Sequence, residues 1–287
     1  MLRFRLAHTF ELVALSDIFI VIVGLLVPTL LKVGKSPWQV LYFVVVFSLV
    51  EEILINSFLV PYGLILAFIG LVGFPALGAV VRKKDLRVVL EISGLIFVTR
   101  IALAPFPIKV LELAVSLPAI YTVIMSVIVF YVLFRKIPLS KIKITRGTIK
   151  MPFQILLGAL GLPLGLIEYE ILKPKPLSIG PNPVLNEVYI VLTMILFVGV
   201  TEELLFRGLL LNYLNNLMPN WLGVHLSSLV FSLFHIGYLN PIEVLFAYSA
   251  GVLFAFLVMK TGSLTSSILA HGIGNIVLFT LASTMPH

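Results

Sequence analysis

The residues best suited to catalysis lie in three short stretches near the C-terminal end of the chain, each within a strongly apolar segment. They are Glu202, Glu203 and Arg207 in the first stretch, Phe231 and His235 in the second, and His271 and Asn275 in the third. Carboxylate and imidazole side chains are common general acids and bases in enzymes. Because ionisable side chains are costly in apolar surroundings and mark functional sites there, we interpret the three stretches as parts of one site.

Helical spacing assigns different roles to the two adjacent glutamates. Glu203 and Arg207 are four residues apart, so on a helix they share a face and can form an ion pair. Glu202 lies about 100° away around the same helix and does not share that cation. We therefore predict a structural ion pair between Glu203 and Arg207, and we predict that Glu202 is a general base.

The third stretch places His271 and Asn275 on one helix face, again four residues apart. Gly272 and Gly274 lie between them and have no side chain beyond a hydrogen atom. Glycines at these positions predict the close approach of another backbone or of a substrate.

Residue counts from the expected turns place the polar side chains at a common depth. Glu202 lies 17 residues before a turn at Pro219, and His235 lies 16 residues after it. At about 1.5 Å per residue, both side chains are about 25 Å from that turn. A second turn at Gly262 places Asn275 about 20 Å along the last helix. We therefore expect the polar groups of all three stretches to converge.

The composition indicates which elements must position these residues. Of the 287 residues, 60% are hydrophobic and only 11% are charged, and the mean hydropathy is +1.14. A soluble domain has about 25% charged residues, so the main solvent of this chain must be lipid. Its apolar runs are long and continuous, whereas a membrane β-barrel has short alternating segments. We predict an all-α, multi-pass helical bundle in the cell membrane.

About eight transmembrane helices are expected, within a range of eight to ten, because each needs roughly 20 apolar residues. The apolar runs cover residues 12–31, 39–59, 62–81, 88–106, 110–134, 151–172, 185–217, 221–238, 240–259 and 263–284. The longest polar break is the basic segment 136–150. We take it as a cytoplasmic loop between N-terminal helices of unassigned role (1–135) and a catalytic membrane domain (151–287).

The charge pattern argues against a nucleic-acid partner. The net charge is +7, but the basic residues gather between the apolar runs, as they do in cytoplasmic loops of membrane proteins. Segments 82–87 and 135–150 are separated by two expected passes, so both are predicted on the same side. The chain has no cysteine, which excludes disulfides and a thiol nucleophile.

The three stretches resemble the motifs of the CAAX-protease and bacteriocin-processing family, also called the ABI family of intramembrane glutamic proteases. That family is identified by Glu-Glu-x-x-x-Arg, Phe-x-x-x-His and His-x-x-x-Asn on successive helices. All three occur here in order, beginning at Glu202, Phe231 and His271. The resemblance covers about residues 150–284, and each motif is weak when taken alone.

The resemblance implies a peptidase that needs no cofactor. Glu202 and His235 would activate a water, and His271 and Asn275 would stabilise the oxyanion. Glu203 and Arg207 would stabilise the helix and position Glu202, and Phe231 would be a packing residue. The best-known members remove the last three residues from prenylated Cys-a-a-X proteins, and others act on bacteriocin or pheromone peptides. The implied partners are a peptide or lipidated protein substrate and membrane lipids; no oligomeric state is implied.

Two other classes of function use the same side chains. In a zinc metalloprotease, His235, His271 and Glu202 would be the metal ligands. The sequence lacks the His-Glu-x-x-His helix, and its spacing places no acid to orient either histidine. A proton-coupled transporter or a non-catalytic scaffold also buries Glu and His side chains, but no internal repeat supports a transporter.

Polar residues outside the motifs receive other expectations. Glu168 and Glu170 end an apolar run and are expected at the entrance of the site. In the N-terminal half, a further set lies in or near apolar runs and is expected to form structural pairs. This set is Asp17, Glu51, Glu52, Asn56 and Arg100.

Overall fold

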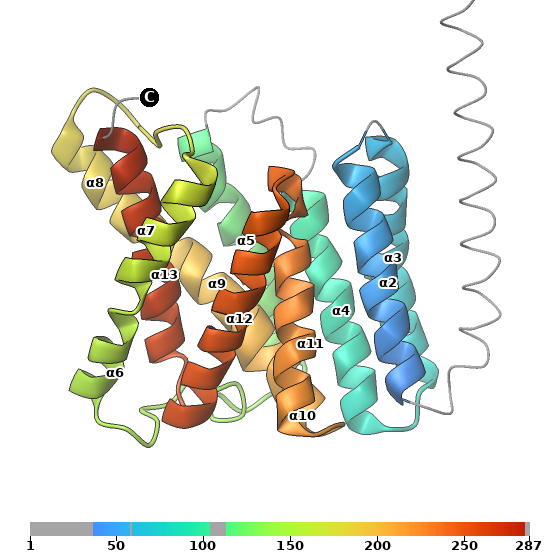
Figure 1. The fold of residues 1–287 in the computed structure, drawn as a ribbon. Helices are drawn as coiled ribbons and strands as arrows, with labels where there is room; N and C mark the ends of the chain where they lie inside the picture. The colour runs from blue at the N-terminus through green and yellow to red at the C-terminus, as the bar shows by residue number, and fades with distance from the viewer. Residues whose placement is uncertain (1–36, 58, 104–112, 285–287) are drawn as a thin grey trace, which may run out of the picture. The chain divides into compact units, whose positions relative to one another are not determined.

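A computed structural model describes residues 37–57, 59–103 and 113–284 (Figure 1). Within these ranges the chain is helical and contains no strand. Eight of the described helical segments are long and apolar enough to cross a membrane. The prediction of an all-α, multi-pass membrane protein is therefore confirmed. The expected run 12–31 and Asp17 lie outside the described residues.

The helices follow the apolar runs of the sequence closely. The first four are α2 (Pro37–Ile55), α3 (Val60–Val80), α4 (Lys84–Leu103) and α5 (Leu113–Phe134). After the basic segment come α6 (Met151–Gly158), α7 (Gly161–Leu172), the long segment 183–215, α11 (Asn220–Leu233), α12 (Pro241–Thr261) and α13 (Thr265–Thr284).

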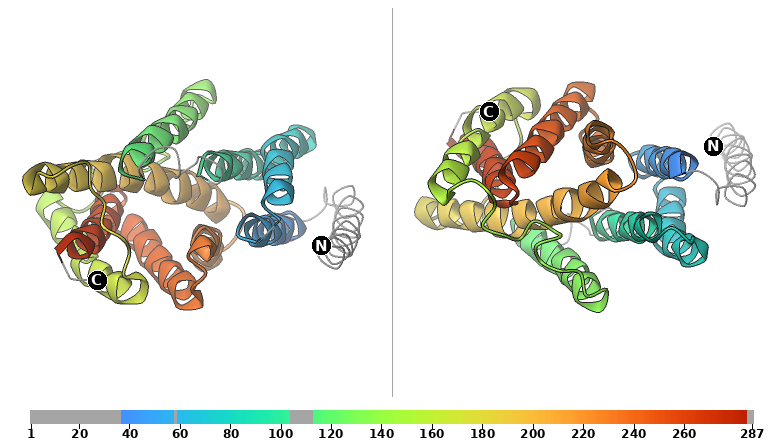
Figure 2. Two further views of the ribbon diagram at one scale, coloured as in Figure 1. Left: turned by 90° about the horizontal axis from the view of Figure 1, so that it is seen from above. Right: turned by 90° about the horizontal axis from the view of Figure 1, so that it is seen from below.

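The described chain divides into two compact units between Phe47 and Ser48, within α2. Of the first unit, only the beginning of α2 is described. The second unit, Ser48–His287, contains all the residues considered below. Seen along the helix axes, segment 183–215 lies between α5 on one side and α12 and α13 on the other (Figure 2).

Segment 183–215 alternates between α-helical and π-helical turns. Its parts are α8 (Pro183–Leu192), the π-helical η2 (Thr193–Gly199), α9 (Val200–Glu203), the π-helical η3 (Leu204–Leu211) and α10 (Asn212–Asn215). π-helical turns are rare and occur frequently at functional sites. The short α-helical stretch between them carries both glutamates of the first motif.

Caps and turns fix the ends of the helices that carry the motifs. The Asn182 side chain accepts a hydrogen bond from the Leu185 amide at 3.1 Å, with proline at the first helical position. Gly262 ends α12 in the left-handed conformation, with φ of 69°. Pro219 directly precedes α11. Both turns used for the depth count are therefore confirmed.

Candidate active site

The ion pair predicted between Glu203 and Arg207 is present and fully buried. Arg207 Nη1 donates to Glu203 Oε1 at 2.7 Å, and neither side chain is exposed. Arg207 Nη2 also donates to the Gly251 carbonyl at 3.2 Å. The guanidinium carbon lies 4.3 Å from the centre of the Phe231 ring and 5.3 Å from that of Phe254. These contacts hold Glu203 in one position, since a buried pair of this kind is costly to break.

His271 is oriented by this buried pair. Its Nδ1 lies 3.0 Å from Glu203 Oε1, and its ring stacks on Phe254 with centroids 5.2 Å apart. In the neutral imidazole, Nδ1–H donates to the ionised Glu203, so Nε2 carries the free lone pair. We expected no acid to orient either histidine, and for His271 this is wrong. Glu203 orients it from another helix, so the spacing along the sequence does not reveal the contact.

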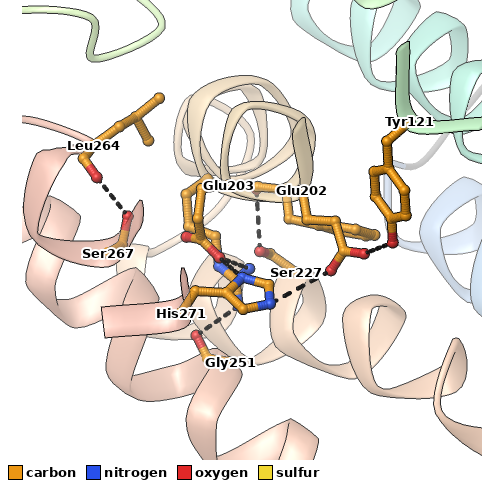
Figure 3. A network of polar contacts seen from close by, with 10 residues as sticks. Tyr121, Glu202, Glu203, Ser227, Gly251, Leu264, Ser267 and His271 are labelled. Carbon is orange, nitrogen blue, oxygen red and sulfur yellow. Dashed lines mark hydrogen bonds and ion pairs between the residues drawn. The ribbon is translucent and has the colours of Figure 1, made fainter. Parts of the chain in front are cut away.

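Glu202 lies between Tyr121 and His271 (Figure 3). The Tyr121 hydroxyl donates a hydrogen bond to Glu202 Oε1. The other oxygen, Oε2, is 3.8 Å from His271 Nε2, and 17% of the Glu202 side chain is exposed. The carboxylate is thus held on one side by a phenol from α5, and its second oxygen faces an imidazole nitrogen from α13.

His235 contacts a different acid. Its Nε2 is 4.0 Å from Glu243 Oε1, and its Nδ1 is buried without a hydrogen-bond partner among the described residues. No imidazole nitrogen of His235 lies within 4.0 Å of a Glu202 oxygen, as His271 Nε2 does. Phe231 packs against both histidines, with its ring centre 5.1 Å from His235 and 5.8 Å from His271.

A pocket of about 340 Å³, including its open mouth, brings the later motifs together. Its polar lining residues are Glu168, His235, Glu243, His271 and Asn275. The convergence predicted by the depth count therefore holds for His235, His271 and Asn275 around this pocket, while Glu202 joins the group through His271.

The two glutamates expected at the site entrance have different surroundings. Glu168 lines the pocket, as the sequence suggested. Glu170 is exposed and forms an ion pair with Lys173 at 3.7 Å. The difference follows from helix geometry, because residues two apart on α7 point in nearly opposite directions.

Close packing against α7 positions α13. A Cβ atom added at Gly161 would lie 2.3 Å from the Ala270 carbonyl oxygen, and one added at Gly165 would lie 2.3 Å from the Gly274 oxygen. Such small-residue contacts let membrane helices approach closely. On another face of α13, a Cβ at Gly272 would lie 3.1 Å from Ile195 Cα. The close approach predicted around His271 is therefore made by neighbouring helix backbones.

Sequence reasoning did not identify three residues that surround the motif side chains. Tyr121, Glu243 and Phe254 contact Glu202, His235 and His271, respectively. Tyr121 and Phe254 lie within apolar runs, where aromatic residues are common. Glu243 is in the first turn of α12, where acids are favoured by the helix dipole. The sequence therefore carried no distinctive signal for Tyr121 or Phe254, whereas Glu243 could have been noticed as an acid inside the apolar run 240–259.

The described polar residues of the N-terminal half form a buried cluster beside the site, with structural pairing as predicted for most of them. Arg100 donates to Glu52, and the Asn56 amide donates to the Glu52 carboxylate at 3.2 Å. The Arg100 guanidinium lies 4.6 Å over the Phe234 ring. Both carboxylate oxygens of Glu51 are buried and form no hydrogen bond within the described part of the chain.

The residues required by the zinc alternative do not form a compact ligand set. Among residues 37–57, 59–103 and 113–284, no group of three or more His, Asp or Glu side chains is arranged to hold a metal ion. His271 Nε2 is near Glu202, and His235 Nε2 is near Glu243. The two imidazoles therefore face different carboxylates.

Comparison with known proteins assigns the segment that carries the motifs to a family. Residues 184–277 match the family described as Type II CAAX prenyl endopeptidase Rce1-like. No curated protein and no solved structure matches the chain. The matched segment begins in α8, ends in α13 and contains every motif residue from Glu202 to Asn275. The chain is therefore a multi-pass membrane protein that contains, at residues 184–277, a domain matching the Rce1-like type II CAAX prenyl endopeptidase family.

Proposed function

We propose that the protein is an endopeptidase that cleaves a peptide bond within the membrane, using a water molecule activated by Glu202. The observation that carries this proposal is the position of Glu202 between Tyr121 and His271. The catalytic unit is residues 151–287, and the N-terminal helices contribute Tyr121. The basic segment 136–150 is the loop between them.

The distance between Glu202 and His271 supports a shared water. Their facing atoms are 3.8 Å apart, which is too far for a direct hydrogen bond. One water can donate its two hydrogens to both acceptors, since two hydrogen bonds of about 2.8 Å span this gap. Its oxygen lone pair is then free to attack a carbonyl carbon, while Glu202 accepts a proton.

The remaining motif residues supply donors for the oxygen of the attacked carbonyl. His235 and Asn275 both line the pocket beside His271. The resemblance paired His235 with Glu202 for water activation and assigned His271 to the oxyanion. The geometry favours the exchange of these two roles, because His271 is the histidine next to Glu202. Removal of one oxyanion donor typically slows a reaction by about 10²–10³-fold.

The proposed substrate is a peptide with a C-terminal lipid-modified Cys-a-a-X sequence. This substrate class follows from the family resemblance. A site buried among membrane helices suits a chain whose lipid anchor keeps it in the bilayer. The scissile bond would enter the pocket beside His235 and Asn275.

Hydrolysis can be tested with the full-length protein in liposomes and a prenylated peptide, with the released tripeptide measured by mass spectrometry. Replacement Glu202→Gln removes the base at constant size and is expected to lower the rate by about 10²–10⁴-fold. Glu187→Gln is the matched control, because Glu187 lies on the same membrane segment and bonds to Thr280 at 2.8 Å, away from the site. Full activity of Glu202→Gln would refute the proposal.

A double-mutant cycle separates the two histidine roles. If His271 shares the water with Glu202, His271→Ala should add little to the loss already caused by Glu202→Gln, because the two act as a unit. His235→Ala should add its own loss to that of Glu202→Gln. The reverse pattern would restore His235 as the partner of Glu202.

A further inference from the structure

A second pocket lies at the ends of the helices and is lined mainly by cations. It encloses about 830 Å³, including its open mouth, and six of its ten described lining residues are lysine or arginine. The six are Arg82, Lys84, Arg87, Arg135, Lys136 and Lys141. They come from segments 82–87 and 135–150, which the sequence predicted on the same side. None of the lining residues that the structure describes is acidic.

The nearby carboxylates already have partners. Glu91 accepts hydrogen bonds from Arg135 Nε at 2.8 Å and from the Tyr131 hydroxyl at 3.0 Å. Asp85 accepts a hydrogen bond from the Asn216 amide at 3.2 Å. Within the part of the chain that the structure describes, the other three exposed cations form no ion pair. These are Arg82, Lys84 and Lys136. Six lining cations thus outnumber these two carboxylates, and the pocket carries a net positive charge.

Several of the cations are held in place rather than free in solvent. Arg87 is half-buried and donates to the Val81 carbonyl at 2.9 Å. Lys141 lies with its ammonium group 4.4 Å over the Tyr213 ring, a cation–π contact. Arg135 is fixed by two hydrogen bonds to Glu91. Fixed donors lose less conformational freedom when an anion binds.

The position of this pocket points to a phosphate group. The candidate membrane spans that adjoin it end at Val80, Phe134 and Asn215. The pocket therefore lies where apolar segments meet water, which is the level of lipid head groups. Basic loops are common at that level, and positive charges scattered over such loops do not by themselves indicate a binding site. Here two loops distant in sequence instead form one pocket, and its described lining includes six cations and no acid.

We propose that this basic pocket binds a phosphate-bearing anion, either a lipid head group or a soluble phosphate. Lysine and arginine donate charge-assisted hydrogen bonds to phosphate oxygens, and arginine can do so with two parallel bonds. The proposal does not rest on the proposed peptidase activity, because its residues and its test are separate.

The test uses the full-length protein in a zwitterionic detergent and a triple variant, R82Q/K84Q/K136Q. The matched control is R146Q/K150Q/K175Q, which removes the same charge at exposed positions that do not line the pocket. One arm measures retention of phosphatidylglycerol, with phosphatidylcholine for comparison, by native mass spectrometry. The other measures the melting temperature during titration with inorganic phosphate, against chloride at equal ionic strength.

A lipid ligand predicts that wild type and control retain phosphatidylglycerol and that the pocket variant binds it at least tenfold more weakly. A soluble ligand predicts a saturable rise in melting temperature with inorganic phosphate that the pocket variant lacks. Equal behaviour of the two triple variants in both arms would overturn the proposal, as would the absence of binding by wild type. The melting temperature without ligand verifies that each variant is folded.

Discussion

Replacement of Tyr121 by phenylalanine isolates the contribution of the hydrogen bond to Glu202. The Tyr121 ring is 5% exposed and packs in a cluster of buried side chains with Leu177, Ile190, Met194 and Val198. Phenylalanine preserves this packing and removes only the hydroxyl that donates to Glu202 Oε1. The variant should therefore fold normally, while the carboxylate loses the contact that orients it.

The expected magnitude follows from the charge on the acceptor. A hydrogen bond to an ionised group is worth about 1.5–3 kcal/mol. Since about 1.4 kcal/mol corresponds to a tenfold change, Tyr121→Phe should lower kcat/KM by about 10–100-fold. The loss should appear in kcat more than in KM, because the hydroxyl holds the base rather than the substrate. Steady-state cleavage of the prenylated peptide in liposomes measures both constants.

Tyr131→Phe provides the matched control. Tyr131 also lies on α5, and it also donates to a glutamate, Glu91 at 3.0 Å, but this pair lies beside the basic pocket. Removal of the Tyr131 hydroxyl should leave kcat/KM within about twofold of wild type. Wild-type kcat in Tyr121→Phe, or equal losses in the two variants, would refute the positioning role of Tyr121.

Further predictions concern the buried ion pair, the helix contact behind the pocket and the need for metal. Glu203→Gln should leave the buried Arg207 without its counter-ion and destabilise the protein by about 3–5 kcal/mol, measured by denaturant unfolding in micelles. Arg207→Lys keeps the positive charge, so it should destabilise the protein less than Glu203→Gln does. Gly165→Leu should separate α7 from α13, because even a Cβ would lie 2.3 Å from the Gly274 oxygen, and should lower both activity and melting temperature. Gly73→Ala, with only a 4.0 Å contact, should be neutral or stabilising. Activity should survive exhaustive chelation, because no proposed step uses a metal; loss of activity that zinc restores would favour the metalloprotease alternative.

The sequence by itself determined the elements and the local pairings. Long apolar runs predicted the membrane helices because backbone groups in lipid must be satisfied within a helix. The Glu203–Arg207 pair was predictable because both residues lie on one helix, four positions apart. The turns at Pro219 and Gly262 were visible because proline and glycine have distinctive backbone preferences.

Only the tertiary structure decided which side chains meet across helices. Tyr121 and Glu202 are 81 residues apart, and Glu203 and His271 are 68 residues apart. Neither contact can be read from helical periodicity along the chain. Each depends on which face of segment 183–215 is covered by α5 and which by α13. The π-helical turns in that segment also change the angle per residue, so a face extrapolated over the whole segment at 100° per residue drifts, although the short step from Glu203 to Arg207 still holds. Helical periodicity reports the neighbours within an element, whereas the partners of Glu202 are set by how three elements pack.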